Sequence, residues 1–208
     1  MADFEALKAA VIRGNRSEVV KIVQEAIDNQ EDLNEILDLG MIPAMREIGE
    51  RFSRNEAYVP ELLIAARAMQ AGLTLIEPLI SASGRTSPGK VAIGTVKGDL
   101  HDIGKNLVAI MLKGAGYEVI DLGVNCDASK YEEAVAQGAQ VIACSSLLTT
   151  TMPYMKEIVE HFKGKDVKIV IGGAPVTQAY ADEIGAAGYG KDANEAVRLI
   201  EAILKDIE

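Results

Sequence analysis

An aspartate and a histidine two positions apart, Asp99 and His101, are the side chains of this sequence best suited to metal chemistry. They follow a short apolar stretch, so we expect them on a loop and not on a buried helix face. A carboxylate that accepts a hydrogen bond from one imidazole nitrogen fixes the tautomer and raises the basicity of the other, as it does for metal-bound histidines. The same triple is compatible with a helix N-cap beside an exposed histidine. Asp-x-His alone therefore indicates a metal ligand only weakly.

Two further segments that follow apolar stretches have unusual composition. Residues 145–151 contain five hydroxyl groups in seven positions, more than the capping of one helix requires. Gly172-Gly173 removes two side chains at the end of a later apolar stretch, where a tight turn is the alternative explanation. A phosphate cradle is disfavoured, because no nucleotide-binding glycine pattern accompanies these residues.

The scaffold that must position these segments is predicted from periodicity in residues 90–208. Five short apolar strands alternate with helical segments at about 103–115, 129–137, 152–163, 176–185 and 192–206. Such alternation predicts a flavodoxin-like (Rossmann-type) α/β domain with a parallel five-stranded sheet covered on both faces. Ligands of such sheets bind at the carboxyl ends of the strands, which is where all three segments fall.

Residues 1–84 have helical spacing throughout and predict an antiparallel helical bundle. We expect Ser17 to cap the second helix, a helical segment to end at Gly40, and Pro60 to lie in the first turn of the last helix. The small and polar residues of 81–89 indicate a linker. The predicted domains are thus a bundle at 1–84, the linker end at 85–89 and the α/β domain at 90–208.

Composition narrows the classes of function. The chain of 208 residues is 49% hydrophobic and 25% charged, as soluble globular proteins are. Its net charge of −10, with no dense basic block, argues against nucleic acid as a partner. The acidic start and the lack of a long apolar run predict a cytoplasmic protein without a membrane partner. Cys126 and Cys144 form no metal-type cluster and are expected to be buried thiols.

Taken together, the three segments resemble the signature of the B12-binding family, D-x-H-x-x-G, then S-x-L, then G-G. The matching residues are Asp99, His101 and Gly104, then Ser145 and Leu147, then Gly172 and Gly173. Residues 98–106 are similar to the cobalamin module of methionine synthase and to the corrinoid proteins of methylamine, methanol and methoxyaromatic methyltransferase systems. Residues 55–66 are similar to the cap segment of that family, so the resemblance covers nearly the whole chain.

The resemblance implies a cobalamin or related corrinoid bound base-off, with His101 as the lower axial ligand of cobalt. Asp99 would hydrogen-bond His101, and Thr151 would stand behind Asp99, where the family often has serine. The cofactor tail would lie near Ser145, with the glycines making room for it. The cofactor-binding residues that follow are Tyr58, Gly94, Asp99, Gly104, Ser145, Leu147, Thr149, Thr151, Gly172 and Gly173. Among them Tyr58 matches an aromatic cap position, from which its hydroxyl is a departure.

By the same resemblance the chain is a methyl carrier of one-carbon metabolism that is not catalytic alone. Its partners would be a donor-specific methyltransferase, an acceptor methyltransferase (such as one for tetrahydrofolate or coenzyme M) and a reductive activase. One alternative is the B12-binding subunit of a mutase, although 208 residues leave no room for a substrate barrel. Another is a B12-sensing regulator, although no basic recognition helix is visible. A flavodoxin-like signalling domain without corrinoid is the third.

Overall fold

The computed structural model describes residues 3–82 and 86–207. The chain divides into two compact units, one of helices up to Ser87 and one that begins at Pro88. The second unit contains all three sequence segments with candidate chemistry, and the first contains Tyr58.

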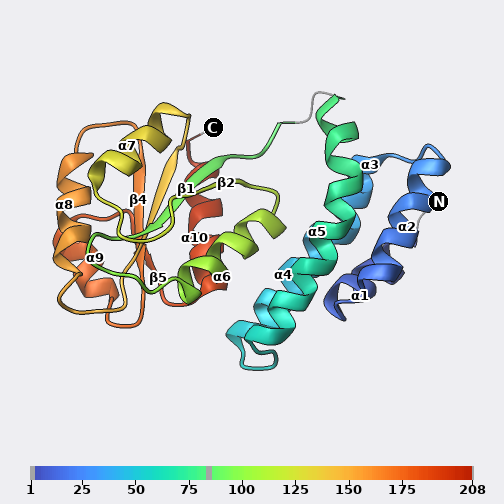
Figure 1. Cartoon of the computed structure of the whole chain (residues 1–208), viewed down its shortest axis with the longest axis horizontal. Helices are drawn as coiled ribbons and strands as arrows, with labels where there is room; N and C mark the ends of the chain where they lie inside the picture. The colour runs from blue at the N-terminus through green and yellow to red at the C-terminus, as the bar shows by residue number, and fades with distance from the viewer. Residues whose placement is uncertain (1–2, 83–85, 208) are drawn as a thin grey trace. The chain divides into compact units, whose positions relative to one another are not determined.

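The first unit is a helical bundle around one apolar core (Figure 1). Its helices are α1 (Phe4–Ile12), α2 (Arg16–Asp28), α3 (Leu33–Glu35), a π-helix η1 (Ile36–Met41), α4 (Ile42–Ser53) and α5 (Val59–Ala82). Large side chains at helical spacing, such as Leu7, Met41 and Met69, are almost completely buried in this core. Burial of these apolar stripes is the main contribution to the stability of such helices.

Two local expectations for the bundle are wrong. The α2 helix is capped by Asn15, whose Oδ1 accepts from the Glu18 N–H at 3.2 Å, while the Ser17 hydroxyl donates to that same oxygen at 3.0 Å. The helix also does not end at Gly40, because η1 carries the chain through it into α4. Pro43 offers a reason, since its nitrogen cannot donate to the carbonyl four residues earlier and the turn before it widens. Pro60 lies in the first turn of α5, as predicted.

Within α5, residues Val59–Ile80 are long and apolar enough to cross a membrane by length and composition alone. The sequence prediction that no apolar run is this long is therefore too strong. The helix contributes to the packed core of the bundle, where Ala65, Met69 and Ile76 are almost fully buried. The core helix of a soluble protein meets the same two criteria, so they are weak support for a membrane span.

The second unit is the predicted α/β domain. Its strands are β1 (Lys90–Thr95), β2 (Glu118–Asp121), β3 (Val141–Ser145), β4 (Lys168–Gly172) and β5 (Gly188–Gly190). All neighbouring strands pair in parallel, in the order β2-β1-β3-β4-β5. The helices are α6 (Ile103–Gly114), α7 (Ala128–Ala136), α8 (Pro153–His161), α9 (Gln178–Ile184) and α10 (Ala193–Lys205). Figure 1 shows α7, α8 and α9 on one face of the sheet and α6 and α10 on the other.

The register places the ends of three strands in one row. Thr95 pairs with Ser145, and Ser145 pairs with Gly172. Their neighbours Cys144 and Ile171 belong to the core beneath α7, α8 and α9. Because successive strand residues point to opposite faces, Thr95, Ser145 and Gly172 face the side of α6 and α10. The loops after β1 and β3 therefore begin side by side at the carboxyl edge of the sheet.

Candidate functional site

The loop after β1 presents His101 next to a buried carboxylate. Asp99 is fully buried, whereas the side chain of His101 is 51% exposed. His101 Nδ1 lies 2.7 Å from Asp99 Oδ1, and the backbone N–H of His101 donates to the same oxygen at 3.0 Å. The aspartate thus holds both the backbone and the ring of the histidine. The Asp-x-His pair predicted from sequence is formed.

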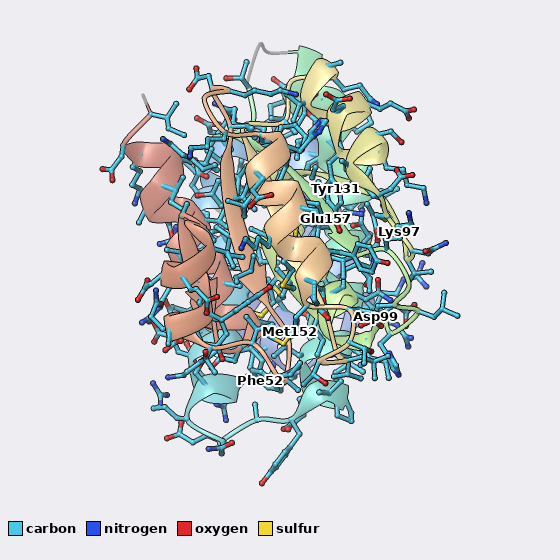
Figure 2. All side chains as sticks on the ribbon, turned by 90° about the vertical axis from the view of Figure 1, so that its left-hand side faces the viewer. Phe52, Lys97, Asp99, Tyr131, Met152 and Glu157 are labelled. Atoms are coloured by element: carbon cyan, nitrogen blue, oxygen red, sulfur yellow. The ribbon has the colours of Figure 1, made fainter. Side chains whose placement is uncertain are left out.

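The other oxygen of Asp99 receives donors from the loop after β3. The backbone N–H of Leu147 donates to Oδ2 at 2.7 Å and that of Leu148 at 3.3 Å. The Thr151 hydroxyl donates to Oδ2 at 3.0 Å, and Ser146 Oγ lies 3.4 Å from it. This loop therefore wraps one carboxylate oxygen, and the predicted contact between Thr151 and Asp99 is present. Figure 2 labels Asp99 and Met152 at this end of the unit.

These hydrogen bonds determine which nitrogen of His101 is free. Burial alone would raise the pKa of Asp99, but the N–H groups of His101 and Leu147, the imidazole and the Thr151 hydroxyl outweigh it, and the pKa lies well below its ordinary value. Asp99 is then an ionised acceptor, so the proton shared with His101 belongs to Nδ1. The lone pair of Nε2 remains available on an exposed ring, which is the arrangement that a metal-binding histidine needs.

A third loop, after β2, supports the turn that precedes Asp99. Asn125 Oδ1 accepts from the Gly98 N–H at 2.8 Å, and the Asn125 N–H donates to the Asp99 carbonyl at 3.0 Å. Gly98 has a φ of 81°, a backbone conformation that favours glycine. The Thr95 hydroxyl, on β1, donates to the His101 carbonyl at 2.8 Å. The loop is therefore held at both its start and its end.

A partly buried ion pair lies at the start of α6. The side chain of Lys105 is only 2% exposed, and its Nζ lies 2.6 and 2.8 Å from the two carboxylate oxygens of Asp121, at the end of β2. Asp121 Oδ1 also accepts from the Gly123 N–H at 2.9 Å. This pair ties the helix that follows His101 to the neighbouring strand. Sequence reasoning did not identify Lys105, although it follows the D-x-H-x-x-G motif directly.

Exposed apolar side chains surround His101. Leu100 and Ile103, on either side of it in the sequence, are 71% and 73% exposed, and Leu147 and Leu148 on the next loop are 45% and 41% exposed. Among the described residues of this unit, the other exposed large apolar side chain is Ile207, at the far end of the chain. Large apolar side chains exposed on neighbouring loops in this way are typical of a binding surface.

The glycines of the motifs have different explanations. A Cβ on Gly173 would overlap the Ser146 carbonyl, so packing within the chain requires glycine there. A Cβ on Gly172 would lie 3.0 Å from the Gly190 carbonyl oxygen, a tight contact that favours glycine. Gly104 has neither a positive φ nor any atom within 4 Å of a Cβ built on it. Nothing in the described chain explains a glycine there, whereas a ligand lying over the start of α6 would.

The resemblance implied that Gly94 makes room for the cofactor tail, but its neighbours are side chains of this chain. A Cβ there would lie 2.8 Å from the Tyr131 hydroxyl and 3.0 Å from Cys126 Sγ, on the face covered by α7. Ser145 points to the other face, so Gly94 does not adjoin it, and we leave Gly94 out of the proposed cofactor site. Both cysteines are buried and free, as predicted.

The remaining predicted residues are not part of the Asp99 network. Thr149 is exposed on the loop after β3, and Ser145 is half-buried at the end of that strand. Tyr58, at the start of α5, is 66% exposed. Sequence reasoning missed Ser146, Asn125 and Lys105; for Ser146 the dense run of hydroxyls was the available signal. Within residues 3–82 and 86–207 no group of three or more acidic, histidine or cysteine side chains could hold a metal ion.

Comparison with known proteins identifies the family of this chain. Two family models, each described as a B12 binding domain, match residues 3–77 and 89–198. A corrinoid protein of Desulfitobacterium hafniense (strain Y51) is 39% identical, over 98% of both chains. A trimethylamine corrinoid protein of Methanosarcina barkeri is 42% identical, over 88% of both chains. The structure of the methanol:cobalamin methyltransferase complex MtaBC from M. barkeri superposes with a TM-score of 0.84 at 28% identity, over 97% of this chain and 79% of that one. This chain belongs to the family of B12-binding corrinoid proteins.

Proposed function

We propose that this chain carries a methyl group on a bound corrinoid between two partner methyltransferases. The observation that supports this most directly is the half-exposed imidazole of His101, which is held through Nδ1 by a buried carboxylate and lies on a loop with exposed apolar side chains. The names of its relatives, a trimethylamine corrinoid protein and the corrinoid-containing methanol methyltransferase complex, support the same class of function.

The residues present fit a flat, largely apolar ligand that carries its own metal. The corrin ring would bring most of the ligands of its cobalt, so the protein would need to supply one ligand only, and His101 is suitably placed. Leu100, Ile103 and Leu147 offer an apolar surface beside the imidazole. Gly104 leaves space over the start of α6. A corrinoid held here would supply a cobalt centre that accepts and releases a methyl group.

The chain's own contribution is to orient and tune one nitrogen ligand. Asp99 keeps the proton on Nδ1, so Nε2 is directed outward as the donor. The amide and hydroxyl donors on Asp99 Oδ2 spread the negative charge of the carboxylate and so limit the electron density it gives to the imidazole. Base-off binding with His101 as the lower ligand is the finer part of this proposal.

The nucleotide tail of the cofactor would lie on the face of the sheet covered by α6 and α10. Ser145 and Gly172 both point to that face. We propose that the Ser145 hydroxyl hydrogen-bonds the displaced base of the cofactor. Gly173 and Leu147 would then line the opening through which the nucleotide tail enters. Thr149 and Tyr58 stay predictions from the resemblance: both are exposed and accessible to a ligand, and Tyr58 would contact the methyl face.

The partners follow from the same proposal. A donor-specific methyltransferase would methylate the corrinoid, and an acceptor methyltransferase (for tetrahydrofolate or coenzyme M) would remove the methyl group. A reductive activase would reduce cobalt that has become oxidised. We propose that these methyl transfers take place in the cytoplasm. The test is reconstitution with cobalamin followed by methylation with purified methylamine, methanol or methoxyaromatic methyltransferases, each with its substrate. Failure of methylation by all of them would contradict the proposed methyl carriage.

The lower ligand can be tested independently of turnover. The chain is labelled with ¹⁵N-histidine, loaded with unlabelled cobalamin and examined as the Co(II) form by EPR. Histidine ligation gives a ¹⁵N doublet splitting, whereas a retained base gives a ¹⁴N triplet. We expect the doublet in the natural chain and its loss in His101→Ala.

The other histidine provides a matched control. His161 lies on α8, where its Nε2 contacts Glu132 Oε1 at 2.7 Å, so His161→Ala should keep the doublet. A doublet that persists in His101→Ala, or a triplet in the natural chain, would refute the proposed ligand.

A further inference from the structure

We propose that Ser146 is a positioning residue for His101, interchangeable with Thr151 as the hydroxyl donor to Asp99. Ser146 lies one position after the serine that matches the family signature, so the motif does not assign it a role. What His101 does once oriented rests on the proposed function, whereas the hydrogen bonds that orient it are present in the chain alone.

The two hydroxyls form one buried cluster. Ser146 is fully buried and Thr151 is 6% exposed, and their oxygens are 2.8 Å apart. Ser146 Oγ lies 3.1 Å from the Leu148 carbonyl oxygen and 3.4 Å from Asp99 Oδ2. Thr151 Oγ1 lies 2.9 and 3.0 Å from the same two oxygens. Both hydroxyls therefore reach the same two acceptors.

The number of protons determines how these acceptors are shared. Each hydroxyl donates once, so the pair can satisfy the Asp99 carboxylate and the Leu148 carbonyl together. When one hydroxyl is removed, the remaining proton must choose between a charged and a neutral acceptor. A hydrogen bond to an ionised acceptor is roughly twice as strong as one between neutral groups, so the remaining hydroxyl should turn to Asp99. Either residue alone then maintains the donor to Asp99.

Loss of both hydroxyls has a different consequence. Asp99 Oδ2 would retain only the backbone donors of Leu147 and Leu148, of which the second is long at 3.3 Å. The carboxylate would then be less restrained about its own axis. Because its other oxygen holds His101 Nδ1, the half-exposed imidazole would lose part of its orientation. The two substitutions should therefore be strongly non-additive.

The test uses the chain without corrinoid. NMR measures the exchange of the His101 Nδ1–H with water in the natural chain, Ser146→Ala, Thr151→Val and the double variant. We expect each single substitution to accelerate exchange by less than about 1.5-fold and the double to accelerate it by about tenfold or more, far above the roughly twofold product of the single effects, as for directly coupled residues. Thr150→Val, an exposed threonine of the same loop, is the control and should match the natural chain. Additive effects, or a full effect of Thr151→Val alone, would overturn the proposal.

A second measurement keeps the proposal testable if the double variant does not fold. In a crystal structure of Thr151→Val, Ser146 Oγ should approach Asp99 Oδ2 to about 2.8 Å, the usual O–H···O length. A distance that stays at 3.4 Å or lengthens would refute interchangeability.

The same variants loaded with cobalamin separate this inference from the proposed function. The ¹⁵N-histidine doublet should persist in both single variants and weaken in the double variant. If the natural chain shows no doublet, the proposed cobalt ligation fails, while the exchange rates still decide the role of Ser146. If the doublet is present and the exchange rates are additive, only the role of Ser146 fails.

Discussion

Two pairs of an acidic and a basic side chain at the carboxyl edge of the sheet bury opposite partners. In one, the Asp99 carboxylate is 0% exposed and its basic partner His101 is 51% exposed. In the other, the Lys105 ammonium is 2% exposed and the Asp121 carboxylate is 38% exposed. The first pair lies within the loop after β1, and the second joins the first turn of α6 to the end of β2. Only the first has a basic partner whose side chain is half-exposed.

The difference shows how burial separates a functional pair from a structural one. A buried carboxylate with several fixed donors cannot rearrange, so it transmits a defined orientation to the exposed histidine. A buried ammonium offers nothing to a ligand, and its bonds to Asp121 serve to tie α6 to β2. The pairs should therefore respond differently to substitution.

The largest effect is expected from Asp121→Ala. This change leaves the Lys105 charge buried without its carboxylate partner, and breaking a buried pair in this way costs about 3–5 kcal/mol. We expect the lower end of that range, because Asp121 is itself partly exposed. Urea unfolding of the chain without corrinoid measures the free energy of unfolding.

Lys105→Met is the matched control for that experiment. It removes the buried charge, keeps a similar volume and leaves Asp121 accessible to water, so the cost should be below about 1.5 kcal/mol. Equal losses of unfolding free energy from Asp121→Ala and Lys105→Met would show that the buried charge of Lys105 is not the cause of the cost. That result would contradict the distinction between the two pairs.

Acid should weaken the structural pair in a defined window. Burial raises the pKa of Asp121, but the Lys105 ammonium and the Gly123 N–H outweigh it, and the pKa lies below its ordinary value of 3.8. A lowered pKa in the folded state contributes stability above the ordinary value, which is lost as the pH falls below it. The difference in urea midpoint between the natural chain and Asp121→Asn should thus be constant near neutrality and shrink below about pH 4. A difference that does not change with pH would contradict the pairing.

The smallest effect is expected for a buried polar group that has no charged partner. The Tyr131 hydroxyl is buried beside Gly94 and, among the described residues, is the one buried side-chain polar atom without a hydrogen bond of good geometry, although the Cys144 thiol interacts with it. Burial raises its pKa, which keeps it neutral. Tyr131→Phe removes a desolvated group without loss of a well-formed hydrogen bond and should be neutral or stabilise by up to about 1 kcal/mol.

Tyr180→Phe is the corresponding control, because the Tyr180 hydroxyl donates to the Met152 carbonyl at 2.8 Å. Its removal should cost about 1 kcal/mol. A larger loss of unfolding free energy for Tyr131→Phe than for Tyr180→Phe would mean that Tyr131 has a well-placed hydrogen-bond partner after all, such as a buried water.

Much of the fold was predictable from local pattern. The alternation of apolar strands and helices predicted the five-stranded parallel sheet, because the period of apolar residues changes with the type of element. The helix caps were less predictable: Asn15 and Ser17 are both good N-cap residues, and only packing selected Asn15. The π-helix through Gly40 could not be predicted, because glycine ends helices more often than it continues them.

For the candidate site, the sequence by itself determined the residue types and their place at strand ends. Asp99, His101 and the hydroxyl-rich segment all follow strands, and parallel strands bring their carboxyl ends to one edge. Only the tertiary structure decided that Ser146 points to Asp99, that Gly94 faces Tyr131 and that Lys105 is buried against Asp121. These facts depend on strand register and on contacts between residues 16 to 52 positions apart, which no local pattern of residues contains.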